Sequence, residues 1–230
     1  MLKRFIISPP FGNYIKPDWA TSVSGTFTLE PRPGLVWNTI KTLRPIKGGW
    51  VNKIGLRNRG IDNANFRDNE LCSIADHTGG NAWLQICEKI PKGQMVEINA
   101  SCPNVGHYSI SSDVLAIFAA KFRCVVVKVP PTEEGMFMVV KAHKAGINTV
   151  HLCNTIPVPG GGESGQRLKT LSLKMVEETK QLFPEMKVIG GGGIYTKQDL
   201  KDYENAGADH FSLATIWFTP WKVKRLFDED

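Results

Sequence analysis

Short β-branched runs recur along the chain, and each ends in Asn, Gly, Pro or Thr. In the second half these runs are separated by stretches with apolar residues at helical spacing, so the pattern predicts repeated strand–helix units. Strands are predicted at residues 4–8, 22–28, 82–87, 95–100, 124–129, 149–154, 187–191 and 210–214. Helices are predicted at residues 112–121, 133–145, 170–182 and 196–206.

Parallel strands that alternate with helices in this number close most readily into an α/β fold, the (β/α)8 TIM barrel. Such barrels typically need about 250 residues, so this chain of 230 predicts an abbreviated barrel. The shortening is expected in the first half, because residues 11–21 and 88–94 are short for crossover connections. Residues 1–230 are expected to form a single domain.

Composition narrows the classes of protein. No apolar run is long enough to span a bilayer, and prolines follow the start MLKRFIISPPFG too early for a signal peptide, so a cytoplasmic protein without a membrane partner is expected. The five cysteines form no CxxC pair, which favours free thiols over disulfides or a metal site. The net charge of +6 lacks an aromatic–basic motif, so an anionic small ligand explains it better than nucleic acid.

The segment VEINASCPN at residues 96–104 is the most informative stretch for chemistry. Pro103 restricts the residue before it, so Cys102 is expected at the carboxyl end of a strand. Asn99 and Asn104 flank this cysteine with amide groups that suit a neutral, multiply hydrogen-bonding ligand such as a pyrimidine or a flavin edge. A buried structural cysteine beside turn-forming asparagines remains the alternative interpretation.

Two later segments predict a phosphate site. The glycines from Gly190 to Gly193 separate a strand from a helix, so bare backbone N–H groups can approach an anion there. Ala214 and Thr215 end the next predicted strand, and barrels frequently bind phosphate after their last two strands. A side chain at Gly192 is therefore expected to fill the phosphate site and leave the barrel folded. A tight turn is the alternative for the glycine run.

Three further segments are candidates for binding. Lys128 ends a valine-rich strand and needs an electron-rich partner such as an anionic cofactor, unless it snorkels from the rim. Asn154 and Thr155 close the next strand in the same way. The remaining candidates lie in connections between the predicted elements. They are Asn52 with the Gly55–Leu56 backbone, and Ser164 with Gly165 in a glycine-rich loop at residues 160–165. Each of these connections is either a ligand contact or a plain loop.

In their order along the chain, these segments resemble the dihydroorotate dehydrogenase family from about Gly25 to Lys222. The resemblance is carried by TFTLEPRPG, VNKIGLRNRGID, EINASCPNV, VVKVPP, GGGESG, VIGGGGIYT and AGADHFSLAT. The SCPN cysteine and TLEPRPG resemble the soluble class 1 branch. The resemblance implies an FMN-containing barrel that oxidises dihydroorotate to orotate in pyrimidine biosynthesis.

Residue roles follow only from this resemblance. It makes Cys102 the catalytic base and Lys128 the cation at the flavin edge. It assigns substrate binding to Asn52, Gly55, Leu56, Asn99, Asn104, Asn154 and Thr155. It assigns FMN binding to Thr26, Asn99, Lys128, Ser164, Gly165, Gly192, Gly193, Ala214 and Thr215. Fumarate, or NAD through an electron-transfer partner subunit, are the acceptors it implies, and class 1 relatives are homodimers.

Two departures from the family pattern bear on turnover. Class 1 members carry a lysine just before TLE, where this chain has Gly25; Lys16 and Lys53 are candidate replacements, and Gly25→Lys is expected to restore the charge. Ala214 replaces a glycine of the last phosphate loop. The alternative function is a reduced barrel that binds FMN or a pyrimidine without efficient turnover.

Overall fold

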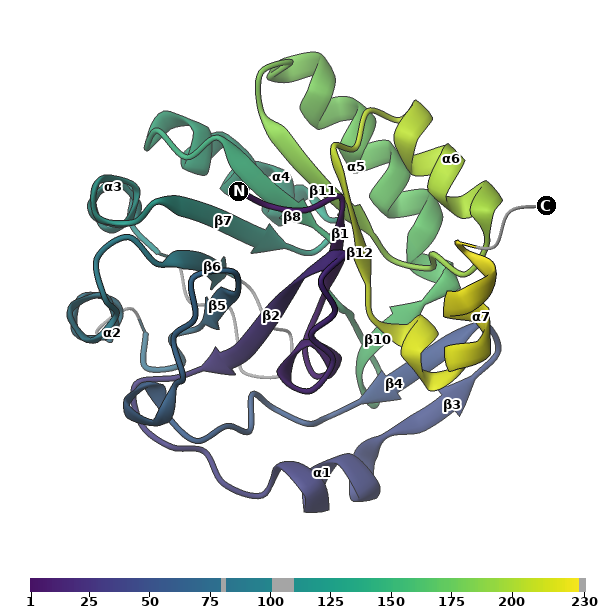
Figure 1. Ribbon diagram of the computed structural model, residues 1–230, viewed down its shortest axis with the longest axis horizontal. Helices are drawn as coiled ribbons and strands as arrows, with labels where there is room; N and C mark the ends of the chain where they lie inside the picture. The colour runs from purple at the N-terminus through teal and green to yellow at the C-terminus, as the bar shows by residue number, and fades with distance from the viewer. Residues whose placement is uncertain (80–81, 101–109, 228–230) are drawn as a thin grey trace.

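Eight parallel strands form a closed barrel in the computed structural model, which describes residues 1–79, 82–100 and 110–227 (Figure 1). Each strand pairs with the next along the chain, and the last pairs with the first. The strands are β1 (Phe5–Ile7), β2 (Ala20–Phe27), β5 (Leu71–Ile74), β6 (Met95–Asn99), β7 (Cys124–Val129), β8 (Thr149–Leu152), β11 (Lys187–Gly191) and β12 (His210–Leu213). The predicted TIM-barrel class is confirmed.

Helices cover one side of this barrel. Figure 1 shows them from the lower left, over the top, to the right. They are α2 (Trp83–Lys89), α3 (Ser112–Lys121), α4 (Glu133–Lys144), α5 (Lys169–Leu182), α6 (Lys197–Asn205) and the short α7 (Pro220–Arg225). The helix predictions from α3 to α6 hold within a residue or two. Thr196 caps α6 through a capping box with Asp199.

One prediction in the first half is wrong. Residues 82–87 were expected to form a strand, but they begin the crossover helix α2, and the strand that precedes it is β5, which the sequence pattern did not reveal. The buried side chains Trp83, Ile86, Cys87 and Ile90 recur at helical spacing, but an apolar run this short fits either element. The connection at 88–94 is therefore no sign of a trimmed barrel.

The expected shortening is found between β1 and β2. In this described segment a single 3-10 turn (Phe11–Asn13) takes the place of a crossover helix. The next connection carries α1 (Leu35–Thr42), none of whose residues is buried. Val36, Trp37 and Ile40 on α1 are about 70% exposed, so this helix does not cover the barrel wall. Figure 1 places it along the lower edge, apart from the other helices.

A second, antiparallel sheet stands beside the barrel. Its strand order is β3 (Arg44–Ile46), β4 (Gly49–Asn52), β10 (Gly161–Gly165) and β9 (Ile156–Val158). No strand was predicted in this sheet: residues 160–165 were expected to be a glycine-rich loop, and Asn52 was expected in a connection. The structure gives these glycines a steric reason: a Cβ at Gly49 would lie 2.1 Å from the Ser164 carbonyl oxygen, and one at Gly161 would lie 2.1 Å from that of Asn52.

The barrel interior changes character along its axis. One end is apolar and holds a separate cluster of buried side chains, Ile6, Val23, Leu71, Met95, Val126 and Ile189. Two residues further along three of these strands the buried side chains are Ser73, Glu97 and Lys128. Since residues i and i+2 of a strand point to the same face, these polar groups lie inside the barrel toward the carboxyl ends of the strands.

Candidate functional site

Two adjoining cavities, of about 250 and about 600 Å³, open beyond these strand ends. Both are lined by Asn52, Ile54, Lys128, Asn154 and Thr155, so they share a wall. Their position matches the face on which (β/α)8 barrels carry their active sites. We call the smaller one the inner cavity and the larger one the outer cavity.

The inner cavity brings together the residues predicted to bind phosphate. It is lined by Ser164, Gly165, Gly192, Gly193, Ala214 and Thr215, from the ends of β10, β11 and β12. The Tyr195 hydroxyl donates a hydrogen bond to Thr215 Oγ1 at 2.7 Å. Since Thr215 accepts this bond, its own hydroxyl proton can be donated to an anion in the cavity.

The structure changes the expectation for Gly192. This glycine lines the inner cavity, but a Cβ built on it would point at Leu168 Cβ and Ser172 Oγ, both 3.2 Å away. Its φ of +99° also disfavours any side chain. A valine there would therefore strain the packing against α5 instead of filling the phosphate site, so the predicted loss of binding in an undisturbed barrel does not follow.

The outer cavity collects the candidate substrate contacts. Asn52, Gly55, Leu56, Asn99, Asn154 and Thr155 all line it, together with Thr26, which the sequence predicts as an FMN contact. Cys102 and Asn104 lie outside the described residues, so their positions are not placed. Sequence analysis missed Arg57, Arg59 and Arg67, which also line this cavity. Their positive charge suits an anionic group at its rim.

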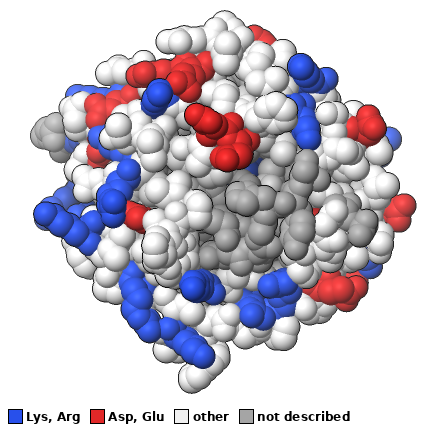
Figure 2. Space-filling view, turned by 180° about the vertical axis from the view of Figure 1, so that it is seen from behind, with Lys and Arg blue, Asp and Glu red and all other residues white. Residues whose placement is uncertain are grey.

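Positive charge extends beyond this rim. Residues 31–61, which include α1, β3 and β4, hold seven Lys and Arg residues and no Asp or Glu. Figure 1 places these elements along the lower edge of the molecule, and Figure 2, seen from behind, shows blue atoms gathered along its lower left. A field of one sign beside a cavity raises the local concentration of anionic ligands.

Lys128 lies at the wall shared by the two cavities. Its side chain is 9% exposed, and among the described residues its ammonium has no hydrogen-bonded or ion-paired partner. It stands beside Asn99 on β6 and His151 on β8 in the strand register. A buried ammonium is costly unless an acceptor meets it, so the cavity favours a ligand with negative charge or oxygen acceptors at this point.

Beneath Lys128 lies a charged network that sequence analysis missed. The Glu97 carboxylate accepts hydrogen bonds from Ser73 Oγ at 2.9 Å and from His151 Nδ1 at 2.8 Å, and all three side chains are fully buried. Burial by itself would raise the pKa of Glu97, but Lys128, His151 and Ser73 outweigh it and lower that pKa to about 2. Burial and the charge of Lys128 lower the pKa of His151, despite the opposing effect of Glu97.

The ionic states follow from these shifts. Glu97 is ionised and His151 is neutral near pH 7, so Glu97 carries the counter-charge to Lys128. One sequence signal could have revealed the network. Glu97 and His151 each occupy a position in a short strand whose neighbours on both sides are apolar, where an isolated charge is expected only with a partner.

The described cysteines do not supply a thiolate. Burial raises the pKa of Cys153, which lines the inner cavity, to about 11, and it raises that of Cys72 to about 12. It also raises the pKa values of Cys87 and Cys124. All four are free, as predicted, and all stay protonated near neutral pH.

Gly25 cannot be replaced by a lysine without backbone movement. Its φ is +110°, and an added Cβ would lie 2.4 Å from the Ser73 carbonyl oxygen. Its backbone N–H and C=O are both hydrogen-bonded to the Asn13 side chain. Of the two candidate replacements, Lys16 lines the outer cavity and is paired with Glu70, whereas Lys53 is exposed and does not line it.

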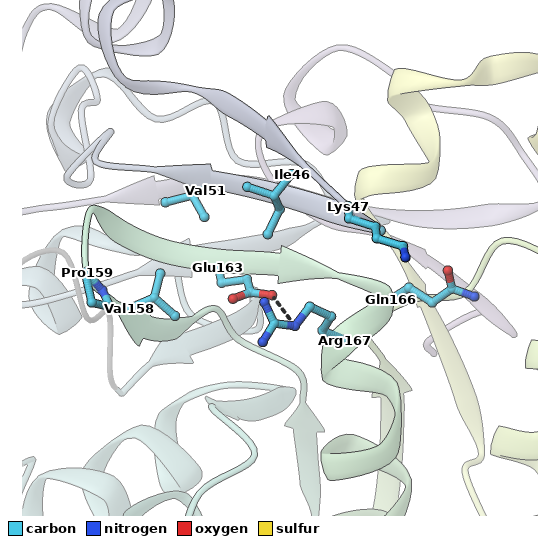
Figure 3. Close-up of a pocket in the computed structure, with 9 residues that line it drawn as sticks. Ile46, Lys47, Val51, Val158, Pro159, Glu163, Gln166 and Arg167 are labelled. Atoms are coloured by element: carbon cyan, nitrogen blue, oxygen red, sulfur yellow. Dashed lines mark ion pairs between the residues drawn. The ribbon is translucent and has the colours of Figure 1, made fainter.

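A third depression lies on the antiparallel sheet, away from the barrel mouth. Figure 3 shows its walls, formed by Ile46 and Val51 on one side and Val158 and Pro159 on the other, with Glu163 turned toward Arg167. The Glu163–Arg167 ion pair measures 3.3 Å. This groove of about 740 Å³ contains none of the candidate residues, because Glu163 and its neighbour Ser164 point to opposite faces of β10.

Residues 1–79, 82–100 and 110–227 contain no cluster of His, Cys, Asp and Glu side chains suited to a metal ion. Within the same ranges, no helix combines the length and apolar content needed to cross a bilayer.

Comparisons with known proteins agree on one family. A sequence model for "Dihydroorotate dehydrogenase" matches residues 12–229. Dihydroorotate dehydrogenase A (fumarate) of Lactiplantibacillus plantarum is 27% identical over 219 residues, which cover 79% of this chain and 70% of the relative. Dihydroorotate dehydrogenase B (NAD(+)), catalytic subunit, of Halalkalibacterium halodurans is 28% identical over 240 residues, covering 88% and 77%.

The fold comparison agrees. The crystal structure of ligand-free dihydroorotate dehydrogenase from Eimeria tenella superposes with a TM-score of 0.70 at 18% identity. The match covers 97% of this chain and 82% of that one.

Proposed function

Because this chain belongs to the dihydroorotate dehydrogenase family, we propose that it binds FMN and oxidises dihydroorotate to orotate, a step of pyrimidine biosynthesis. The observation that carries this proposal is Lys128, which lies at the wall shared by the inner and outer cavities. Its ammonium is nearly buried and has no hydrogen-bonded or ion-paired partner among the described residues. A flavin that carries negative charge in its reduced form is a suitable counterpart.

The residues present fit FMN. Gly193, Ala214 and Thr215 line one end of the inner cavity, where a free hydroxyl proton and the backbone suit a phosphate. Ser164 and Gly165 add the end of β10 to this wall, and Gly192 shapes the turn. Thr26, Asn99 and Lys128 would meet the ring edge. When bound, FMN supplies the acceptor for the two electrons that dihydroorotate loses.

Substrate would occupy the outer cavity. Asn52, Asn99, Asn154, Thr155 and the Gly55–Leu56 backbone supply amide and hydroxyl groups for a pyrimidine ring, and the arginines at the rim suit its carboxylate. Asn104 belongs to this set on sequence grounds. Conversion to orotate removes a proton from C5 and a hydride from C6 of the substrate.

Cys102 is assigned the C5 proton. The assignment rests on its place in SCPN, and the raised pKa values of the four described cysteines leave it as the remaining thiol for this role. The proton would pass from C5 to Sγ. Lys128 would face the negative charge that develops in the cavity.

One observation favours the alternative of a barrel that binds FMN or a pyrimidine without efficient turnover. The backbone at Gly25 excludes the lysine that the class 1 pattern places there, so one fixed positive charge is absent from that position. Removal of a preorganised charge commonly costs about a hundredfold in rate. Turnover by this chain is therefore expected to be slow.

The electron acceptor and the assembly complete the proposal. One relative is named for fumarate, and the other is named as the catalytic subunit of an NAD(+) enzyme. We propose that fumarate or NAD reoxidises the flavin, and that electrons would reach NAD through an electron-transfer partner subunit. A homodimer in the cytoplasm is the assembly expected by analogy with class 1.

Reconstitution followed by an acceptor panel tests the function. The purified chain should take up FMN in a ratio of one to one and form orotate from dihydroorotate with fumarate, NAD or an artificial acceptor. Firm FMN binding without orotate from any acceptor would favour the binding protein. A chain that takes up neither FMN nor a pyrimidine would contradict both readings.

A further inference from the structure

Four hydrogen bonds connect the buried Glu97 carboxylate to two asparagines at the outer cavity. Ser73 Oγ bonds to Glu97 Oε1 at 2.9 Å, and Thr26 Oγ1 and Ser73 Oγ are 3.0 Å apart. Asn99 Nδ2 lies 3.3 Å from Thr26 Oγ1, and Asn154 Nδ2 lies 2.8 Å from Asn99 Oδ1. A fifth bond follows, in which Asn154 Oδ1 accepts the Thr155 N–H at 2.9 Å.

The direction of each bond follows from the charge at one end. An ionised carboxylate only accepts, so Ser73 must donate its single hydroxyl proton to Glu97. With that proton committed, Ser73 can only accept from Thr26, which must then donate. With its own proton committed, Thr26 can only accept from Asn99, so the NH2 group of Asn99 has to face Thr26.

The amide orientation obtained by this proton count agrees with the structure. Asn99 places Nδ2 toward Thr26 and Oδ1 toward Asn154, and Asn154 places its own Nδ2 toward Asn99. The Thr155 N–H, which donates to Asn154 Oδ1, enforces the same orientation from the other end. Two independent constraints, a buried charge and a backbone donor, therefore fix one polarity along the chain.

His151 helps to keep the Glu97 carboxylate ionised, so that it only accepts hydrogen bonds. Its Nδ1 lies 2.8 Å from Glu97 Oε2, and its Nε2 has no partner among the described residues. A neutral imidazole has one N–H, and the carboxylate requires that this N–H be on Nδ1. Glu97 thus receives two donors, Ser73 and His151, from strands on either side of β6 and β7.

We propose that Glu97 is a positioning residue that sets the hydrogen-bond polarity of Asn99 and Asn154 and thereby selects the ring edge that the outer cavity accepts. After its bonds within the chain, Asn99 retains the capacity of one N–H and one lone pair. The Asn99 lone pair can accept from a ring N–H, and the Asn99 N–H can donate to a ring C=O beside it. A ring edge that has an acceptor in place of this N–H and a donor in place of this C=O is disfavoured. The identity of the ring rests on the proposed function; the polarity does not.

Neutron diffraction from crystals of the ligand-free protein tests the polarity directly. Deuterium is expected on Ser73 Oγ toward Glu97, on Thr26 Oγ1 toward Ser73, and on His151 Nδ1, with the Asn99 amide nitrogen facing Thr26. Deuterium on the Glu97 carboxyl, or a Thr26 hydroxyl that donates to Asn99, would overturn the proposal. This result is independent of FMN, substrate or turnover.

Ligand selectivity tests the consequence. Orotate presents N–H beside C=O at its N3 edge, and its 4-amino analogue, cytosine-6-carboxylate, presents the reverse. The FMN-loaded wild-type protein is expected to prefer orotate, and Ser73→Ala, which cuts the chain between Glu97 and Thr26, is expected to reduce the ratio of the two Kd values by about tenfold. Thr179→Val is the matched control.

The control removes another fully buried hydroxyl, on α5, which has no partner among the described residues. It should leave the Kd ratio unchanged even if it lowers stability, whereas a merely structural role of Ser73 would lower both affinities equally. An unchanged ratio in folded Ser73→Ala would overturn the selectivity claim. Failure of the wild type to bind either pyrimidine would instead contradict the proposed function, and the neutron result would still decide the polarity.

Discussion

Gly25 on β2 lies so close to Ser73 on β5 that a Cβ at Gly25 would be 2.4 Å from the Ser73 carbonyl oxygen. The same β2 segment provides Thr26, which bonds to the Ser73 side chain. The position at which class 1 members carry a lysine is therefore occupied here by backbone packing. The loss of that charge and the tight approach of β2 to β5 are one structural feature.

The first prediction concerns this approach. Gly25→Ala and Gly25→Lys should each lower the free energy of unfolding by roughly 3 kcal/mol, because both impose a positive φ and a backbone clash on a side chain. Urea unfolding measures the loss. Gly93→Ala is the control, since its φ is +85° but nothing lies within 4 Å of the added Cβ. A Gly25→Ala variant as stable as Gly93→Ala would show that β2 can relax.

Lys128 should control flavin affinity. Lys128→Met keeps the length of the side chain but removes the charge, so the Kd for FMN should rise by roughly tenfold to a hundredfold, as expected for a lost hydrogen bond to a charged group. Fluorescence titration measures this change. Lys174→Met removes an exposed lysine of α5 and should leave the Kd unaltered. Equal affinities in the two variants would exclude Lys128 from the flavin site.

The hydroxyl of Thr215 should contribute to phosphate binding. Thr215→Val preserves shape but removes the proton that Thr215 can donate, and the Kd for FMN should rise by about tenfold. Riboflavin, which lacks the phosphate, should bind the variant and the wild type alike. If Thr215→Val weakened riboflavin and FMN equally, the hydroxyl would act on the ring and not on the phosphate.

Glu97 should leave a signature in acid stability. Its pKa is about 2 in the folded protein and near 4.5 when unfolded, so its contribution is present above pH 4.5 and is lost as the pH falls toward 2. The wild type should lose a few kcal/mol of stability over this window, and Glu97→Gln should show a flatter profile there. Denaturant unfolding at a series of pH values measures the difference. Parallel profiles would mean that Glu97 titrates normally.

The sequence predicted the regular parts of the fold because local rules govern them. The apolar spacing around residues 112–121 and 196–206 agrees with the packing of α3 and α6, so the bounds of these helices were predicted closely. Residues 82–87 were misassigned because six apolar and polar positions fit a strand as well as a helix. The antiparallel sheet was missed because its glycines serve close backbone contact, which a single sequence does not distinguish from flexibility.

The candidate site likewise contains residues that the sequence could predict and residues that it could not. Residues at strand ends, such as Lys128, Asn154 and Thr215, could be named because the barrel brings all strand ends to one face. Glu97 and His151 escaped notice because their pairing crosses the barrel interior past β7, between positions 54 residues apart. The strand order β6–β7–β8 and the shared interior face bring them together, and neither is visible in the local sequence.

Anaerobic single-turnover reduction tests the central claim most directly. FMN-loaded protein is mixed with dihydroorotate in a stopped-flow instrument without any acceptor, and the visible flavin band and the orotate formed are followed together. The account predicts that the band bleaches in a phase that depends on dihydroorotate concentration, with one orotate per flavin, and that Cys102→Ala retains FMN but slows this phase strongly. Bound FMN that stays oxidised at saturating dihydroorotate, or a Cys102→Ala variant as fast as the wild type, would contradict it.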